Sequence, residues 1–166
     1  MEFLPVLKTQ DFKAVEALAF PIWREHYTPI ISAAQVEYML QKFQTAAAVK
    51  KQLAQGFLYF LLQLPEAGSM GFLAVKPESG ELYLDKLYLL KEHRGKGHAR
   101  EVLRFLTGMA REKGLSRITL AVNKRNPAVK VYEALGFRNA GPVVTDIGEG
   151  FLMDDFRMVL ELPRKH

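Results

Sequence analysis

The segment Leu87–Ala99, LYLLKEHRGKGHA, constrains the fold more than any other part of the sequence, because three local signals meet in it. An alternating apolar run ends, a basic glycine-rich turn follows, and a helical pattern begins at once. The helix is predicted to end at Gly114 and to carry one apolar stripe, formed by Ala99, Val102, Leu103, Leu106, Met109 and Ala110. A strand, a tight turn and an amphipathic helix in this order favour a sheet with helices packed on it.

The turn itself is a candidate anion site. Glycines let backbone N–H groups point outward at the start of a helix, where the helix dipole favours negative charge. The turn is not a P-loop, because His98 stands where that motif has Lys, and it is not a dinucleotide fingerprint, because Arg100 stands where that motif has Gly. Two interpretations remain open: a phosphate-binding turn, or a strand–turn–helix corner with a solvated basic face.

The remaining patterns predict one sheet and several helices, an α/β or α+β order. Strands are predicted over Phe3–Lys8, Phe57–Gln63, Met70–Lys76, Glu81–Leu90, Arg117–Asn123, Phe137–Thr145 and Phe151–Leu162. Helices are predicted from a Thr9 cap to Tyr27, from a Ser32 capping box to Gly56 as one or two helices, and from Asn126-Pro127 to Gly136.

Composition narrows the class of protein. The 166 residues carry a net charge of +5 and fit a single domain, residues 1–166. Cysteine is absent, which excludes disulfides, thiolate metal sites and a cysteine nucleophile, and the four histidines lack metal-ligand spacing, so no metal is expected. No apolar run reaches membrane-spanning length and no signal-peptide pattern begins the chain, so we expect a cytoplasmic protein without membrane contact.

Two motifs together resemble the GNAT family, the GCN5-related N-acetyltransferases. Arg94-x-x-Gly97-x-Ala99 is similar to that family's acyl-CoA signature, and Asn126-Pro-Ala-Val-Lys-Val-Tyr132-Glu-Ala-Leu-Gly136-Phe137 is similar to its later asparagine–tyrosine segment. The resemblance covers about Met70 to Leu162. It implies a mixed, mostly antiparallel sheet of about seven strands with helices on both faces. The fourth and fifth strands are expected to splay apart into a cofactor slot.

The resemblance also implies acetyl-CoA as cosubstrate and assigns much of a site. Backbone N–H groups would hold the pyrophosphate along the turn, which comprises Arg94, Gly95, Lys96, Gly97, His98 and Ala99. Leu87, Tyr88 and Leu89 would pair with the pantetheine arm, and the Leu89 N–H would reach the thioester oxygen. Asn126 would contact the cofactor, although a role as helix cap explains it equally well. Tyr132 would protonate the departing thiolate.

The resemblance assigns the general base and the acceptor pocket less clearly than the coenzyme-binding residues. Many relatives carry a glutamate on the fourth strand, where this chain has Tyr83; Asp85 is our candidate base, with Glu81 or His26 as alternatives acting through water. Trp23, Tyr27 and Tyr83 are candidate acceptor-binding residues, and Glu25 and Glu37 would help to hold a cationic amine. A helix pair with an aromatic core side is the favoured explanation of Trp23 and Tyr38.

These features predict direct transfer of an acetyl group from acetyl-CoA to a primary amine of a small molecule or polyamine. Two alternatives keep the same fold: a non-catalytic acyl-CoA sensor and an acetyltransferase for protein amines. Leu120-Ala121-Val122 stands where enzymes acting on protein N-termini often have Leu-Glu-Val, which counts against that subclass. Nucleic acid is not an expected partner, since acidic residues interrupt any basic track. A monomer or homodimer is expected.

Overall fold

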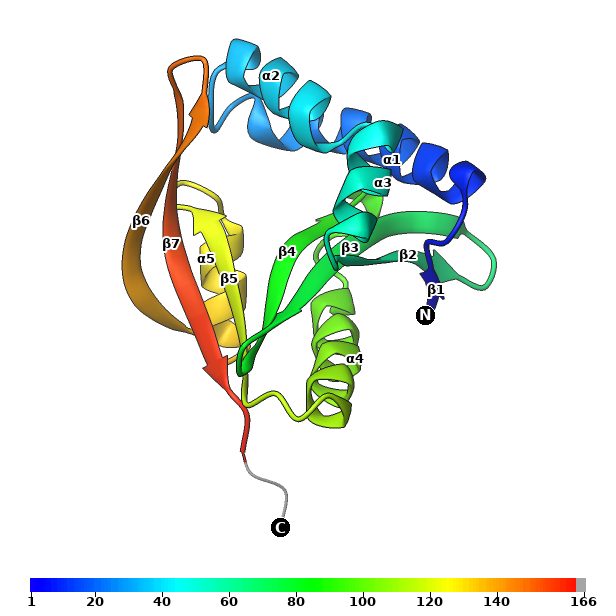
Figure 1. Ribbon diagram of the computed structural model, residues 1–166, viewed down its shortest axis with the longest axis vertical. Helices are drawn as coiled ribbons and strands as arrows, with labels where there is room; N and C mark the ends of the chain where they lie inside the picture. The colour runs from blue at the N-terminus through cyan, green and yellow to red at the C-terminus, as the bar shows by residue number, and fades with distance from the viewer. Residues whose placement is uncertain (164–166) are drawn as a thin grey trace. The chain divides into compact units, whose positions relative to one another are not determined.

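The computed structural model describes residues 1–163 and confirms a mixed, mostly antiparallel seven-stranded sheet in this part of the chain (Figure 1). The helical elements are α1 (Thr9–Tyr27), α2 (Ala33–Phe43), α3 (Ala46–Ala54), η1 (Lys91–His93), α4 (His98–Glu112) and α5 (Ala128–Ala134). The strands are β1 (Glu2–Pro5), β2 (Leu58–Leu64), β3 (Gly68–Glu78), β4 (Glu81–Leu89), β5 (Arg117–Asn123), β6 (Arg138–Gly148) and β7 (Phe151–Glu161).

The strand order is β1-β2-β3-β4-β5-β7-β6. The β4–β5 pair is parallel, whereas β1–β2, β2–β3, β5–β7 and β6–β7 are antiparallel. The helical connection through α4 explains why β4 and β5 are parallel, since parallel neighbours need a crossover while antiparallel strands can be joined by tight turns.

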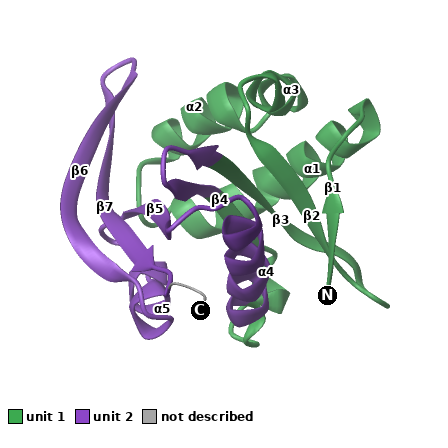
Figure 2. Ribbon diagram, turned by 60° about the horizontal axis from the view of Figure 1, so that its bottom comes forward, with its two compact units in different colours: residues 1–76, 86–98 green, residues 77–85, 99–166 purple. Residues whose placement is uncertain are grey.

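The chain divides into two compact units (Figure 2). Unit one comprises residues 1–76 and 86–98, and unit two comprises residues 77–85 together with the chain from Ala99 onward. Strand β4 belongs to both, because Glu81–Asp85 lie in unit two and Lys86–Leu89 in unit one. The single domain over residues 1–166 stays a prediction.

In unit one, capping residues set the helix boundaries. The predicted segment Ser32–Gly56 forms two helices, because Thr45 starts the second by accepting the Ala48 N–H at 3.1 Å. Ser32 caps α2 as predicted, accepting the Gln35 N–H at 3.1 Å. Helix α1 differs slightly from expectation: Lys8 rather than Thr9 occupies the N-cap position, and the Asp11 carboxylate accepts the N–H groups just before the helix.

A buried lysine joins elements of unit one. Lys86 is 5% exposed, and its Nζ donates to Phe43 O at 2.8 Å, Gln52 Oε1 at 3.1 Å and Tyr59 Oη at 2.7 Å. These acceptors come from the end of α2, from α3 and from β2, so the ammonium group fixes the two helices to the sheet. A buried charge is tolerated here because all three of its N–H donors have partners.

In unit two, β5 is the central strand. It pairs with β4 from Glu81↔Arg117 to Leu84↔Leu120, and with β7 along its whole length, from Arg117↔Glu161 to Asn123↔Asp155. The buried side of α4 carries Val102, Leu106 and Ala110, which belong to the predicted stripe. Within residues 1–163, no helix has the length and apolar character needed to cross a bilayer.

Candidate active site

The predicted anion-binding turn lies between η1 and α4. Gly95 and Gly97 have φ angles of +72° and +81°, a backbone conformation that side-chain-bearing residues adopt at a cost. A Cβ at either glycine would meet nothing within 4 Å, so backbone conformation rather than packing requires them. Lys96 is exposed and His98 is half-buried. The first N–H groups of α4 have no acceptor within the helix, which is what an anion site uses.

The side chain of Arg94 holds the turn in place. Its Nε donates to Leu89 O at 3.0 Å, and its Nη1 lies 2.7 Å from Glu25 Oε1 on α1. The guanidinium is therefore engaged within unit one, and binding of a ligand by the backbone N–H groups of the turn stays a prediction. Glu25, which we expected to help hold the amine, is paired with Arg94. Glu37 is likewise paired, with Arg24 at 2.8 Å.

β3 packs closely against β4 at the segment Leu87–Leu89, whose contact with pantetheine stays a prediction. A Cβ at Gly71 would lie 2.1 Å from Tyr88 O and 3.0 Å from Leu89 Cα, so only glycine fits there. The neighbouring Leu90 N–H donates to Met70 O at 2.8 Å. Sequence reasoning missed Gly71; the available signal was a glycine inside an apolar strand, which often marks a close backbone approach.

An aromatic cluster brings three predicted site residues together in unit one. The ring centroids of Trp23 and Tyr27 are 4.3 Å apart, and Tyr88 lies 5.6 Å from Trp23 and 6.2 Å from Tyr27. The ring centroid of Phe72 on β3 lies 5.4 Å from that of Tyr88. Trp23 is 3% exposed, so it supplies core packing, whereas Tyr27 and Tyr88 are half-buried.

Unit two contains Tyr132, the predicted general acid, and Asn126, the predicted cofactor contact. Tyr132 lies on α5, half-buried, with its ring 5.5 Å from that of Phe137. Asn126 is buried, and its Oδ1 accepts the Ala128 N–H at 2.9 Å, so it caps α5 as expected, although Pro127 occupies the formal N-cap position. The capping role is established, and contact of Asn126 with a cofactor stays a prediction.

The candidate bases on β4 have different surroundings. Glu81 lies 3.7 Å from Arg117 and 3.4 Å from Arg157, and it accepts a hydrogen bond from Thr119. The carboxylate of Glu81 is thus already engaged by two arginines and a hydroxyl group. Burial, followed by the charges of Asp85, Asp155, Glu78 and Glu81, raises the pKa of Tyr83 far above its usual range. Tyr83 therefore remains a neutral phenol.

Asp155 on β7 is a candidate that sequence reasoning missed. It is 4% exposed, and burial, with a smaller effect of Asp154, raises the pKa of its carboxyl to about 6. The available signal was a carboxylate inside a strand pattern, because acidic residues are rarely fully buried without a partner. In the sequence it looked like one more surface acid.

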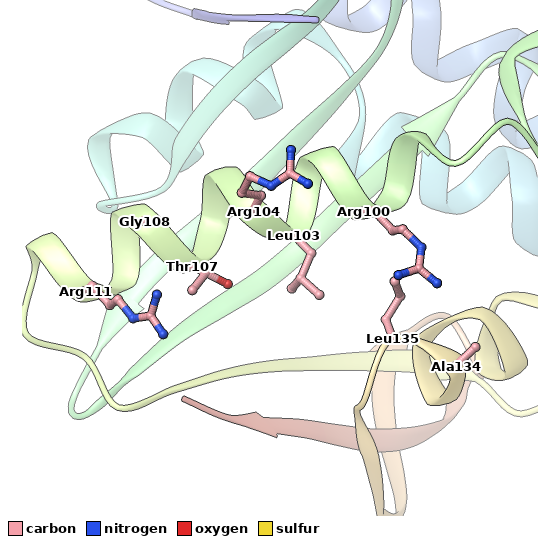
Figure 3. Close-up of a pocket in the computed structure, with 8 residues that line it drawn as sticks. All are labelled: Arg100, Leu103, Arg104, Thr107, Gly108, Arg111, Ala134 and Leu135. Carbon is pink, nitrogen blue, oxygen red and sulfur yellow. The ribbon is translucent and has the colours of Figure 1, made fainter. Parts of the chain in front are cut away.

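Unit two also has a hollow of about 560 Å³ between α4 and the end of α5. Arg100, Arg104 and Arg111 line it from α4, and Figure 3 shows Arg100 extending toward α5. Two of these arginines, Arg100 and Arg104, lie in the first two turns of α4, next to the glycine turn.

The structure thus distributes the predicted site residues between the units. Trp23, Tyr27, Leu87–Leu89 and the turn up to His98 belong to unit one. Tyr83, Asp85, Ala99, Asn126 and Tyr132 belong to unit two. Among the histidines, aspartates and glutamates of residues 1–163, no group is arranged to hold a metal ion.

Comparisons with known proteins identify the family. Residues 27–160 match the acetyltransferase (GNAT) domain. N-acetyltransferase family 8 member 2 of Rattus norvegicus is 30% identical over 101 residues, which are 58% of this chain and 45% of that protein. The chain thus spans less than half the length of that relative.

Solved structures agree on the fold. The PaiA N-acetyltransferase of Thermoplasma acidophilum, determined in complex with coenzyme A, has a TM-score of 0.77 and 20% identity, with 98% of this chain and 100% of that chain covered. A GCN5-related N-acetyltransferase of Rhodopseudomonas palustris has a TM-score of 0.80 and 17% identity, and the match covers 97% of this chain and 95% of that chain. The chain belongs to the GNAT family of acetyltransferases.

Proposed function

We propose that this protein transfers an acetyl group from acetyl-CoA directly to a primary amine of a small molecule or polyamine. The observation that carries the proposal is the turn before α4, whose two left-handed glycines present backbone N–H groups in a chain of the GNAT family. Coenzyme A in the Thermoplasma relative supports the choice of cosubstrate.

In the proposed reaction, the amine nitrogen forms a bond to the thioester carbonyl carbon and the carbon–sulfur bond breaks. The Arg94–Ala99 turn binds the pyrophosphate, and Leu87–Leu89 position the pantetheine arm. The Leu89 N–H stabilises the carbonyl oxygen as it gains negative charge. Tyr132 gives its proton to the departing thiolate, and the amine gives a proton to a base. No covalent intermediate on the protein is required.

Charge supports a cationic acceptor. Four carboxylates, Glu78, Glu81, Asp85 and Asp155, act electrostatically on Tyr83, and two arginines, Arg117 and Arg157, lie close to one of them, Glu81. The balance of these charges is negative. An alkylamine is protonated at pH 7 and would be attracted there. Ala121 stands on the same strand face without a carboxylate, which supports a small amine rather than a protein N-terminus.

Calorimetric titration of acetyl-CoA tests cosubstrate binding. We expect micromolar binding by the wild type and at least a 100-fold loss in Gly97→Glu, because the new side chain and its charge oppose the pyrophosphate. Gly68→Glu is the matched control: Gly68 also has a positive φ, +69°, and open space around it, but it lies at the β2–β3 turn. No heat from the wild type would refute the acetyltransferase proposal.

Turnover is tested by thiol release from acetyl-CoA with a panel of primary monoamines, diamines and polyamines. Tyr132→Phe removes the proposed acid and keeps the ring that packs on Phe137. We expect kcat to fall by roughly 10²-fold or more with unchanged acetyl-CoA affinity. Binding of acetyl-CoA without thiol release for any amine would favour the non-catalytic sensor.

A further inference from the structure

We propose that the Asp155 carboxylate is the general base of this acetyltransferase, taking the proton of the acceptor amine from the sheet face that also carries Tyr83 and Asp85. The inference rests on the proposed function and adds the residue that the sequence left unassigned.

Strand register places Asp155 on this face. Tyr83 of β4 pairs with Thr119 of β5, and Thr119 pairs with Val159 of β7. Paired residues point to the same side of a sheet, and residues two apart along a strand share a face. Counting from Val159 in steps of two therefore brings Asp155 to the side that carries Tyr83. Asp85 shares that side, being two residues after Tyr83.

The neighbours of Asp155 on β5 are small or polar. Asn123 is its direct partner on β5, and Ala121, one step further along the same face, contributes only a methyl group. From β6, the partner of Asp155 is Val143, which brings no charge. A substrate amine on this face would thus meet Asp155 without an intervening cation from β5 or β6.

The nearby basic side chains are engaged by other carboxylates. Arg157, on β7 itself, lies 3.4 Å from the Glu81 carboxylate, and Arg117 lies 3.7 Å from it. Lys124 Nζ lies 2.9 Å from Oδ1 of the neighbouring Asp154. Among residues 1–163, no hydrogen bond or ion pair joins the Asp155 side chain to another group, and its oxygens keep some contact with solvent although the residue is only 4% exposed.

A buried carboxylate without a partner is unusual, because removing its charge from water costs free energy. The negative charge of the neighbouring Asp154 increases that cost. The result is a carboxyl whose pKa lies at about 6, ionised at neutral pH and readier to take a proton than an exposed aspartate. A cationic amine would supply the missing partner.

The proposed step balances. The ammonium group of the acceptor gives one proton to an oxygen of Asp155, either directly or through one water. The freed nitrogen lone pair forms the bond to the thioester carbonyl carbon, the carbon–sulfur bond breaks, and the thiolate takes the proton of Tyr132. The nitrogen, now cationic, loses its second proton, which restores the Tyr132 phenol, and Asp155 returns the first proton to solvent. Tyr83 takes no proton in this step, since the surrounding negative charge keeps its phenol protonated. It can orient the amine by hydrogen bonding.

Asp155→Asn tests the assignment, because the amide keeps the shape and removes the basic oxygen. Wild type and variant are compared by thiol release from acetyl-CoA, with the amine panel and with water alone, between pH 5 and 9. We expect the variant to lose at least 100-fold in kcat, to keep its acetyl-CoA affinity and to lack the inflection near pH 6. Asp154→Asn is the matched control, with unchanged kcat at pH 8 and an inflection moved to lower pH.

Each other outcome decides against the assignment. Turnover by Asp155→Asn within threefold of wild type would exclude Asp155 as the base. A wild type that binds acetyl-CoA but releases no thiol with any amine or with water would also exclude it, while leaving coenzyme binding established. A wild type that gives no heat with acetyl-CoA would refute the proposed function itself. Should Asp155→Asn unfold, Asp155→Glu must retain measurable turnover, with an inflection shifted from the wild-type position.

Discussion

At the scale of single residues, Asp155 links pH to stability. Its pKa of about 6 in the folded protein exceeds the ordinary value of about 3.9 for an unfolded chain, because burial disfavours the charged form. The folded state therefore binds the proton more tightly than the unfolded state. This contribution to stability is complete below about pH 4 and is lost as the pH rises through about 6.

Asp155→Asn removes this dependence. Above pH 7 we expect the variant to be more stable than the wild type, by at most about 3 kcal/mol, since two pKa units correspond to that free energy. At pH 4 the two proteins should be nearly equal. Urea denaturation at pH 4 and pH 8 measures both differences. A variant less stable than wild type at pH 8 would mean that the carboxylate has a stabilising partner.

The residues that could be predicted from the sequence are those that act through local chemistry. The Arg94–Ala99 turn and the caps at Ser32 and Asn126 depend on neighbours a few positions away, and the local pattern shows them. Asp155 could not be predicted, because its burial results from strand pairing between segments far apart in the chain.

At the scale of elements, β3 and β4 depend on one glycine. In Gly71→Ala the added Cβ would collide with the backbone of Tyr88 and Leu89, which a flexible side chain could not relieve. We expect a loss of roughly 1–3 kcal/mol in stability, as for other overpacked sites. Acetyl-CoA affinity should fall as well, because the displaced strand end includes Leu89. Denaturation and calorimetry measure the two effects.

Gly108→Ala is the control variant, for which we expect a change in stability of the opposite sign. Gly108 lies inside α4, and a Cβ there would meet nothing within 4 Å. Alanine favours a helix interior over glycine by about 1 kcal/mol, so this variant should be more stable than wild type and bind acetyl-CoA normally. If both alanine variants behaved alike, close backbone packing at Gly71 would not be the cause.

Hydrophobic periodicity predicts the type and order of the helices and strands, but it does not predict which strands pair with each other. The helix over α4 and the strand over β5 have the predicted bounds within two residues, because their apolar spacing is regular. Nothing in the β5 pattern Ile118-Leu120-Val122 specifies a parallel neighbour on one side and an antiparallel one on the other. That arrangement depends on the crossover through α4 and on the β6–β7 hairpin.

At the scale of the whole molecule, we expect the two units to unfold together. Strands β3 and β4 each contribute residues to both units, so neither unit can unfold without removing part of a strand from the other. Trp23 is the one tryptophan of the sequence and lies buried in unit one, so its fluorescence reports that unit, while far-UV circular dichroism reports the whole backbone. The two signals should give one midpoint, as for a single cooperative domain.

Acetyl-CoA provides the second arm of this experiment. At 100 times its Kd it should stabilise the folded state by about 2.7 kcal/mol, and it should shift both midpoints equally. Gly97→Glu serves as the control that should show no shift at the same concentration. Separate midpoints, or a shift confined to the fluorescence signal, would mean that the units are independent domains and that only unit one contributes to coenzyme binding.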